Sequence, residues 1–198
     1  MHSSGYLPII YTALETGMRR NELLALQWKD VDVLTGKIHV TKSLKVARGG
    51  EVSDEPPKTE TGRRSIKMPP ELTEFLKKLW EVQQLDVQYG DYAGQYKVGR
   101  GTPVFIYQGT GKRILPNAVT HTFKEIVDAV GLKGVRFHDT RHTHARECFR
   151  RDWHPRIVQA RLGHKTVSIT LDTYTAFIPA LDDALADKFS LEVNVNIF

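Results

Sequence analysis

The residues best suited to chemistry lie in the last third of the chain. His138 and Arg141 are three positions apart, and a Leu-Gly-His sequence ending at His164 precedes Tyr174 by ten residues. Side chains three positions apart are neighbours on a helix surface, so a helix that starts near His138 would bring the first pair together. Cationic and proton-carrying groups beside a phenol are suited to reactions of a phosphodiester.

A compact helical hairpin is expected to position these groups. Gly163 predicts the end of the helix that precedes His164, because glycine readily adopts the backbone of a helix C-cap. Thr166 or Ser168 would cap the next short helix, which would carry Tyr174.

The remaining sequence predicts a mostly helical α+β fold with a small antiparallel sheet. Residues 6–26 read as helix interrupted by Gly17, with Leu23, Leu24 and Leu26 pointing inward. Strands are expected over 31–46, with a tight turn at Thr35-Gly36, and over 64–68, while the segment between 47 and 63 reads mainly as turns. Two later helices open at Pro70 and Pro116, the second ending at Gly131, and their apolar residues recur at helical spacing: Leu72, Phe75, Leu76, Leu79 and Trp80, then Val119, Phe123, Ile126, Val127 and Val130.

Composition places the chain among ordinary globular proteins. The 198 residues are 40% hydrophobic and 26% charged, and no apolar run approaches membrane-spanning length. The single cysteine, Cys148, excludes an internal disulfide and favours a cytoplasmic location. A net charge of +5 is compatible with a nucleic-acid partner but is weak evidence on its own.

The end of the chain, residues 178–198, reads as an amphipathic helix followed by the alternating segment EVNVNIF. That alternation predicts a strand. A lone terminal strand has to pair with a sheet edge, either in its own molecule or in a neighbouring one.

Four motifs in order carry a resemblance to a known family. They are TGMRRNELLALQWKDVD, PKTETGRRSIKMP, HDTRHTHA and LGHKTVSITLDTY. Together they resemble the catalytic domain of the tyrosine recombinases, the phage-integrase family, and most closely the integrases of phages and conjugative transposons. The resemblance runs from about Tyr6 to Phe177 and rests on the set, because each motif alone is weak.

The resemblance implies a role for each matching residue. Arg19 and Arg141 would hold the scissile phosphate, Lys58 would be the family's mobile lysine, and Tyr174 would be the nucleophile. His138 and His164 would take the two histidine positions, and Glu22 would support the first arginine. Candidate contacts to the DNA backbone are the basic residues Arg20, Arg63, Arg64 and Lys165.

Physical chemistry supports these roles. Two guanidiniums can hold the phosphate oxygens bidentately without losing their protons, which makes a metal or other cofactor unnecessary. A free tyrosine has a pKa of about 10, so nearby cations must favour the phenolate while neutral His138 accepts its proton. Lys58 would protonate the leaving 5′-hydroxyl, and His164 would donate a hydrogen bond to the phosphate. A 3′-phosphotyrosyl bond conserves the energy needed for rejoining.

The resemblance also implies the wider setting. Residues 1–198 would be the catalytic domain, with core-binding and arm-binding domains upstream that this chain lacks. The activity would be site-specific integration or excision of a phage or conjugative element in a bacterial cytoplasm, away from the membrane. The partners would be double-stranded attachment sites, three further copies in a tetramer on DNA, and a directionality factor, and the free protein would be a monomer.

Other functions are compatible with parts of the pattern. A type IB topoisomerase shares the arginines, lysine, histidine and tyrosine, but the Leu-Gly-His match and the compact length disfavour it. A DNA-binding accessory protein would have a vestigial catalytic set. His138 and His142 are spaced as in helical zinc sites, yet Arg141 lies between them and no acidic third ligand is nearby, so we predict no metal and a structural or supporting role for His142 and His144.

Overall fold

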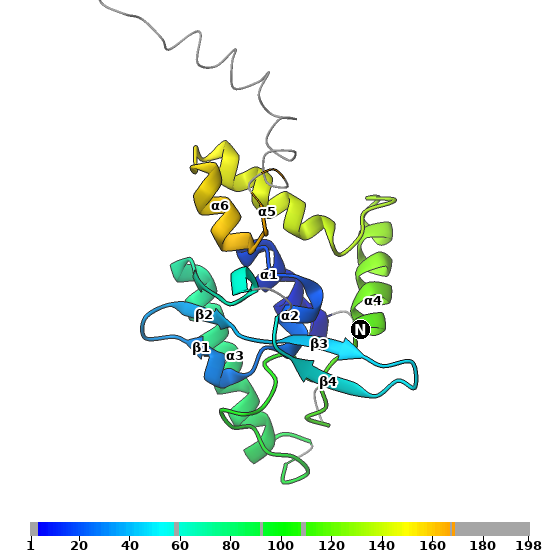
Figure 1. Ribbon diagram of the computed structural model, residues 1–198. Coiled ribbons are helices and arrows are strands. Elements are labelled where there is room, and N and C mark those ends of the chain that lie inside the picture. Colours follow the sequence, from blue (N-terminus) through cyan, green and yellow to red (C-terminus); the bar gives the residue numbers. More distant parts are fainter. Residues whose placement is uncertain (1–3, 58–59, 92, 108–109, 167, 169–198) are drawn as a thin grey trace, which may run out of the picture.

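Helices and two small antiparallel sheets make up the part of the chain that the computed structural model describes, residues 4–57, 60–91, 93–107, 110–166 and 168 (Figure 1). The helices are α1 Leu7–Thr16, α2 Arg20–Ala25, α3 Pro70–Tyr89, α4 Pro116–Ala129, α5 Asp139–Arg150 and α6 Pro155–Leu162. The strands are β1 Val31–Asp32, β2 Lys37–Val40, β3 Ser43–Val46, β4 Val52–Glu55 and β5 Arg64–Lys67. Short 3-10 turns lie at Ser4–Tyr6, Trp28–Asp30 and Glu60–Gly62. The α+β prediction is confirmed.

Gly17 separates α1 from α2, as the sequence predicts. Its φ of 64° lies in the left-handed region, which glycine adopts without steric cost. Its amide donates to the carbonyl of Ala13, which closes the last turn of α1. The chain therefore turns sharply, and Arg19 becomes the N-cap residue of α2.

The strands form two separate antiparallel units. β1, β2 and β5 make a three-stranded sheet in that order, with Ile38 opposite Ile66 at its centre. β3 and β4 make a hairpin of their own, in which Leu44 faces Asp54. The strand over 52–55 was not expected from the sequence, because charged residues in VSDE obscure the alternation.

One core joins the first two helices, the sheet and α3. Its most completely buried side chains come from all of these elements: Ile9, Leu23, Leu24, Ile38, Ile66, Leu72 and Leu76. The apolar stripe of α3 packs as predicted. In α4 the stripe ends earlier than expected, because the helix stops at Ala129 and leaves Val130 67% exposed.

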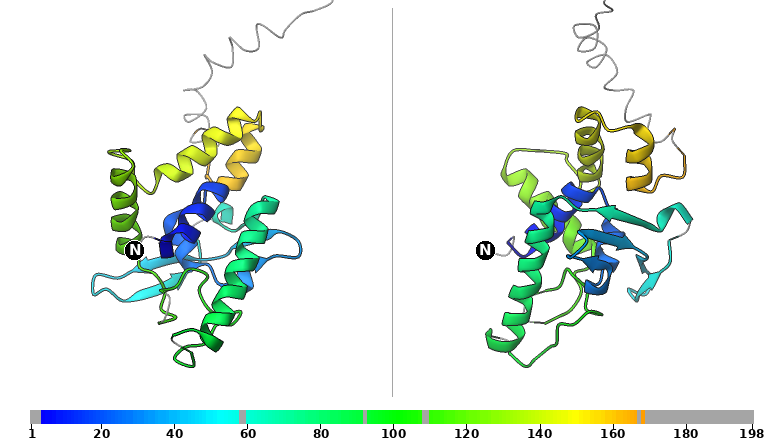
Figure 2. Two further views of the ribbon diagram at one scale, coloured as in Figure 1. Left: turned by 180° about the vertical axis from the view of Figure 1, so that it is seen from behind. Right: turned by 90° about the vertical axis from the view of Figure 1, so that its left-hand side faces the viewer.

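α5 and α6 lie together at one end of the molecule and pack beside α1 (Figures 1 and 2). They share a small second core of Ala145, Cys148, Phe149, Val158 and Leu162. Gly163 ends α6 with a φ of 68°, as the sequence predicts. The predicted tail, residues 178–198, lies outside the described residues. Among the described helices, none is both long and apolar enough to cross a membrane.

Candidate active site

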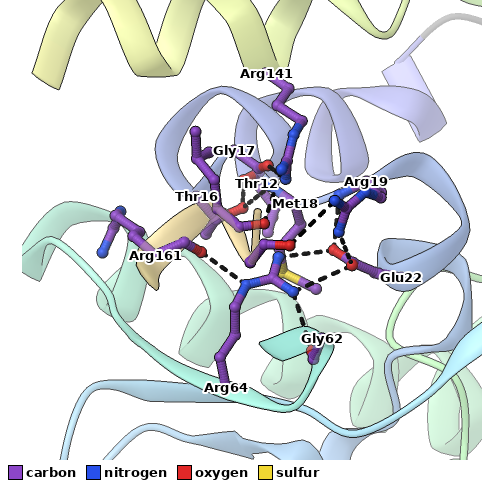
Figure 3. A network of polar contacts seen from close by, with 12 residues as sticks. Thr12, Thr16, Gly17, Met18, Arg19, Glu22, Gly62, Arg64, Arg141 and Arg161 are labelled. Carbon is purple, nitrogen blue, oxygen red and sulfur yellow. Dashed lines mark hydrogen bonds and ion pairs between the residues drawn. The ribbon is translucent and has the colours of Figure 1, made fainter. Parts of the chain in front are cut away.

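The buried carboxylate of Glu22 is the centre of an ionic cluster (Figure 3). Its side chain is 4% exposed, and it accepts from the Arg19 backbone N–H at 2.9 Å and from the Arg19 Nη1 at 2.9 Å. Arg64 approaches from the other side, with its Nη2 2.8 Å from Oε2 and its Nη1 3.1 Å from Oε1. Burial by itself would raise the pKa of Glu22, but the hydrogen bonds and charges of Arg64 and Arg19 lower it below the ordinary value. The carboxylate therefore stays ionised and fixes Arg19.

Arg141 is also held in place from within the protein. The residue is 4% exposed, and its Nη1 and Nη2 donate to the carbonyls of Gly17 at 2.7 Å and Leu162 at 2.8 Å. Burial and, to a smaller extent, the positive charge of Arg19 lower the pKa of Arg141 to about 9, yet the guanidinium remains charged at neutral pH. Each terminal nitrogen of a guanidinium carries two hydrogens, so a carbonyl on one leaves the other for an anion.

Both predicted histidines are placed near this positive charge. His138 immediately precedes α5, and His164 follows the glycine that ends α6. Burial, with the charges of Arg141 and Arg19, lowers the pKa of His164 to about 4; burial, His142 and Arg141 also lower the pKa of His138. Both imidazoles are therefore neutral at pH 7, the state that can accept a proton or donate a single N–H.

The cluster opens into a cleft of about 900 Å³. Its walls are the start of α2, the β3–β4 hairpin, the start of α4 and the turn after α6, and among its lining residues are Arg19, Arg20, Lys45, His164 and Lys165. A second hollow of about 470 Å³ shares Arg19 and Arg20 and is lined by His138. Three arginines and one glutamate beneath these openings leave an excess of positive charge, as an anion site requires.

The structure brings together four of the six predicted catalytic residues, Arg19, His138, Arg141 and His164. Lys58 and Tyr174 lie outside the described residues. Of the candidate DNA contacts, Arg63 and Lys165 are exposed, while Arg20 donates to the Thr120 hydroxyl and the Pro116 carbonyl at the start of α4.

Arg64 does not have the exposed position expected of a DNA contact. Its side chain is 6% exposed, and its donors are used by Glu22 and by the carbonyls of Arg161 and Gly62. The sequence misplaced it because arginine among other basic residues is usually solvated, and nothing local indicates a buried carboxylate about forty residues earlier. We therefore reassign Arg64 from the DNA surface to the support of the site.

Arg161 is a supporting residue that the sequence did not single out. Its Nε donates to the Nε2 of His144 at 2.9 Å, and its Nη1 and Nη2 donate to the carbonyls of Lys67 at 2.8 Å and Glu15 at 2.9 Å. The Nδ1 of His144 contacts the carbonyl of Leu14 at 2.8 Å, so this ring joins α5 to α1. The structural role expected for His144 fits these contacts, which use both ring nitrogens. Within the described ranges no cluster of three or more His, Cys, Asp or Glu side chains is arranged to hold a metal ion.

The His144–Arg161 contact predicts a pH dependence of folding. Burial and the charge of Arg161 lower the pKa of His144 to about 4, from about 6.5 when unfolded. Between these values the unfolded chain binds more protons, so stability falls as pH falls from about 6.5 toward 4, by up to about 1.4 kcal/mol per pH unit for this residue.

The free energy of unfolding, measured with urea at several pH values across this range, should change less with pH in His144→Gln than in wild type. The remaining pH dependence would come from other groups whose pKa values are lowered on folding, among them His164 and His138. Exposed His121 provides the matched control, because His121→Gln should keep the wild-type pH dependence of the unfolding free energy. The same pH dependence in all three proteins would contradict the claim that protonation of His144 destabilises the fold.

A model of the phage integrase family matches residues 5–179. The chain belongs to this family. Two curated relatives are each 30% identical to it, a tyrosine recombinase XerC-like protein of Caldanaerobacter subterraneus over 84% of this chain and the ICEBs1 integrase of Bacillus subtilis over 89%. This integrase-family chain covers only 44% and 46% of those two relatives, so it spans about half their length.

Solved structures of other recombinases share the fold. The Tn1549 transposon integrase, in complex with transposon right end DNA, superposes with a TM-score of 0.73 at 22% identity, over 92% of this integrase-family chain and 59% of that one. The XerA recombinase gives a TM-score of 0.68 at 19% identity, over 96% of this chain and 58% of the other. The predicted family and fold are therefore confirmed.

Proposed function

We propose that this chain catalyses site-specific recombination by cutting and rejoining DNA through a covalent bond to Tyr174. The observation that carries the proposal is the cluster in which buried Glu22 fixes Arg19 at the wall of a cationic cleft, with buried Arg141 beside it. Rigid guanidiniums are suited to the charge that develops on the phosphate oxygens during attack. Relatives named as the ICEBs1 integrase and as an integrase of Staphylococcus phage L54a favour a mobile element as the substrate.

The proposed reaction is a balanced exchange of one phosphodiester for another. The phenolic oxygen of Tyr174 attacks phosphorus and gives its proton to neutral His138. The bond from phosphorus to the 5′-oxygen breaks, and Lys58 protonates that oxygen. Arg19, Arg141 and His164 hold the non-bridging oxygens throughout. Rejoining reverses these steps, so the reaction consumes no ATP.

The proposed setting follows the same family relationship. The substrate would be double-stranded DNA carrying attachment sites, contacted through the basic residues Arg20, Arg63 and Lys165 at the cleft and its surroundings. Recombination requires four strand cuts, so four copies would assemble on two duplexes, in a bacterial cytoplasm and under control of a directionality factor.

Substitution of Tyr174 by phenylalanine tests the proposal. On a nicked suicide duplex that carries the attachment site, wild type should form a covalent adduct that maps to Tyr174 by mass spectrometry. Tyr174→Phe should reduce the adduct by at least about 1,000-fold, because the variant has no nucleophilic oxygen.

Tyr89→Phe provides the matched control, since Tyr89 is 74% exposed on α3 and should leave the adduct unchanged. An adduct that persists in Tyr174→Phe would overturn the assignment of the nucleophile. Relaxation of supercoiled DNA lacking the attachment site would indicate a topoisomerase instead of a recombinase.

A further inference from the structure

Three arginines converge on the C-terminal end of α6. The last carbonyls of a helix have no partner within the helix and form the negative end of its dipole, so they attract cations. Here three consecutive carbonyls each accept from a different guanidinium: Arg161 from Arg64 at 2.7 Å, Leu162 from Arg141 at 2.8 Å, and Gly163 from Arg19 at 3.2 Å.

The turn itself satisfies the two preceding carbonyls. The amide of Gly163 donates to Ala160 at 3.2 Å, and the amide of His164 donates to Gln159 at 3.2 Å. This pattern is a Schellman turn, closed by the left-handed glycine. Each carbonyl from 159 to 163 thus has a partner, which fixes the direction in which the chain continues into His164.

Arg64 is the member of this trio that has no assigned role at the phosphate. Its Nε holds α6, its two terminal nitrogens hold the Glu22 carboxylate of α2, and Nη1 also donates to the Gly62 carbonyl at 3.2 Å, just before β5 (Figure 3). One buried guanidinium therefore joins three segments that are distant in sequence.

We propose that Arg64 is a positioning residue for strand cleavage. Arg64 fixes Glu22, and through Glu22 also Arg19, relative to the turn that carries His164. Arg19 and His164 can therefore contact the same phosphate. Arg64 does not touch the phosphate itself. This role rests on the proposed function.

The close packing of the turn supports this assignment. A Cβ at Gly163 would lie 2.9 Å from the Thr61 carbonyl oxygen and 3.0 Å from the Nη1 of Arg64. The turn therefore rests directly on the guanidinium, and a shift of Arg64 would be transmitted to it. Lysine keeps the charge but has a single nitrogen, which cannot span Glu22 and α6 together.

Arg64→Lys tests the proposal, with Arg113→Lys as the matched control. Arg113 makes a comparable bidentate ion pair with Asp54, with Nη2 2.9 Å from Oδ2, and is partly buried away from the α6 turn. Three quantities are compared for both variants and wild type: the single-turnover rate of adduct formation on the nicked duplex, the Kd for that duplex, and hydrogen exchange of individual amides.

Arg64→Lys should slow adduct formation by about 100-fold, since a displacement of about 1 Å at a catalytic group has an effect of that size. The Kd should change by less than about threefold, because no phosphate contact is lost. Exchange at the Gly163 and His164 amides should be about tenfold faster, while the central Ile38 amide exchanges as in the control.

Adduct formation equal to that of Arg113→Lys would overturn the positioning role. A tenfold weaker Kd with a smaller salt dependence would show instead that Arg64 contacts a phosphate. If wild type itself formed no adduct, the proposed function would fail, and the exchange data would still decide the structural claim: unchanged protection of the Gly163 and His164 amides would refute it.

Discussion

Glu22→Gln is expected to lower the free energy of unfolding by about 3–5 kcal/mol, the range for removing one partner of a buried ion pair. The carboxylate accepts hydrogen bonds from Arg19 and Arg64 and is the negative charge between them. Glutamine offers a single acceptor oxygen and directs an NH₂ group at a guanidinium. Buried Arg64 and partly exposed Arg19 then repel each other, with Arg141 adding a third positive charge. Urea denaturation at pH 7, followed by circular dichroism, measures the loss.

The matched control is Glu74→Gln on the exposed side of α3. Its carboxylate is about half exposed and lies 3.9 Å from the Nζ of Lys77 and 4.0 Å from that of Lys78. Exposed pairs of this kind contribute between 0 and about 1 kcal/mol, so the change should be small. Equal losses in the two variants would show that the cluster around Glu22 does not stabilise the fold.

The stabilisation by Glu22 also has a predictable pH dependence. Its pKa is lowered on folding, so the unfolded chain takes up the proton first as the solution is acidified. The contribution is therefore complete above the unfolded pKa of about 4.3 and is lost as pH falls through the lowered folded value. Glu22→Gln should lack this acid transition, which begins at the acid end of the pH range assigned to His144.

Local signals in the sequence were sufficient to predict most of the helical framework. Gly17 and Gly163 mark helix ends because both positions require a positive φ, and the apolar stripe of α3 follows the spacing of its buried face. The family motifs placed Arg19 beside Glu22, a pairing that three-residue spacing alone also favours. These features depend on neighbours within one or two turns, which is the range that a sequence pattern can report.

The contacts that hold the site could not be predicted in this way. Arg64 meets Glu22 across 42 residues, and Arg141 meets the carbonyl of Gly17 across 124. Backbone carbonyls carry no sequence signature, so the partners of Arg161 were equally hidden. The motif thus identified residues suited to contact a phosphate, while their support depends on tertiary packing.

Gly17→Ala is expected to reduce the free energy of unfolding by about 2–5 kcal/mol. About 1–2 kcal/mol comes from placing an L-residue at a φ of 64°. Overpacking should add roughly 1–3 kcal/mol, because the new Cβ would lie 2.6 Å from Cδ2 of Leu162 and 2.7 Å from Cδ2 of His144. Both side chains pack between α1, α5 and α6, so neither can move away without opening that contact.

Gly131→Ala separates the two causes. Gly131 has a φ of 81° and nothing within 4 Å of the position of a new Cβ, so this variant carries the backbone cost alone. If Gly17→Ala loses more unfolding free energy than Gly131→Ala, the difference is the cost of crowding Leu162 and His144. The Gly17 carbonyl also holds Arg141, so adduct formation should fall in Gly17→Ala but not in Gly131→Ala. Equal stability and equal adduct formation in the two variants would contradict the view that this contact between α1 and the α5–α6 pair orients the arginine.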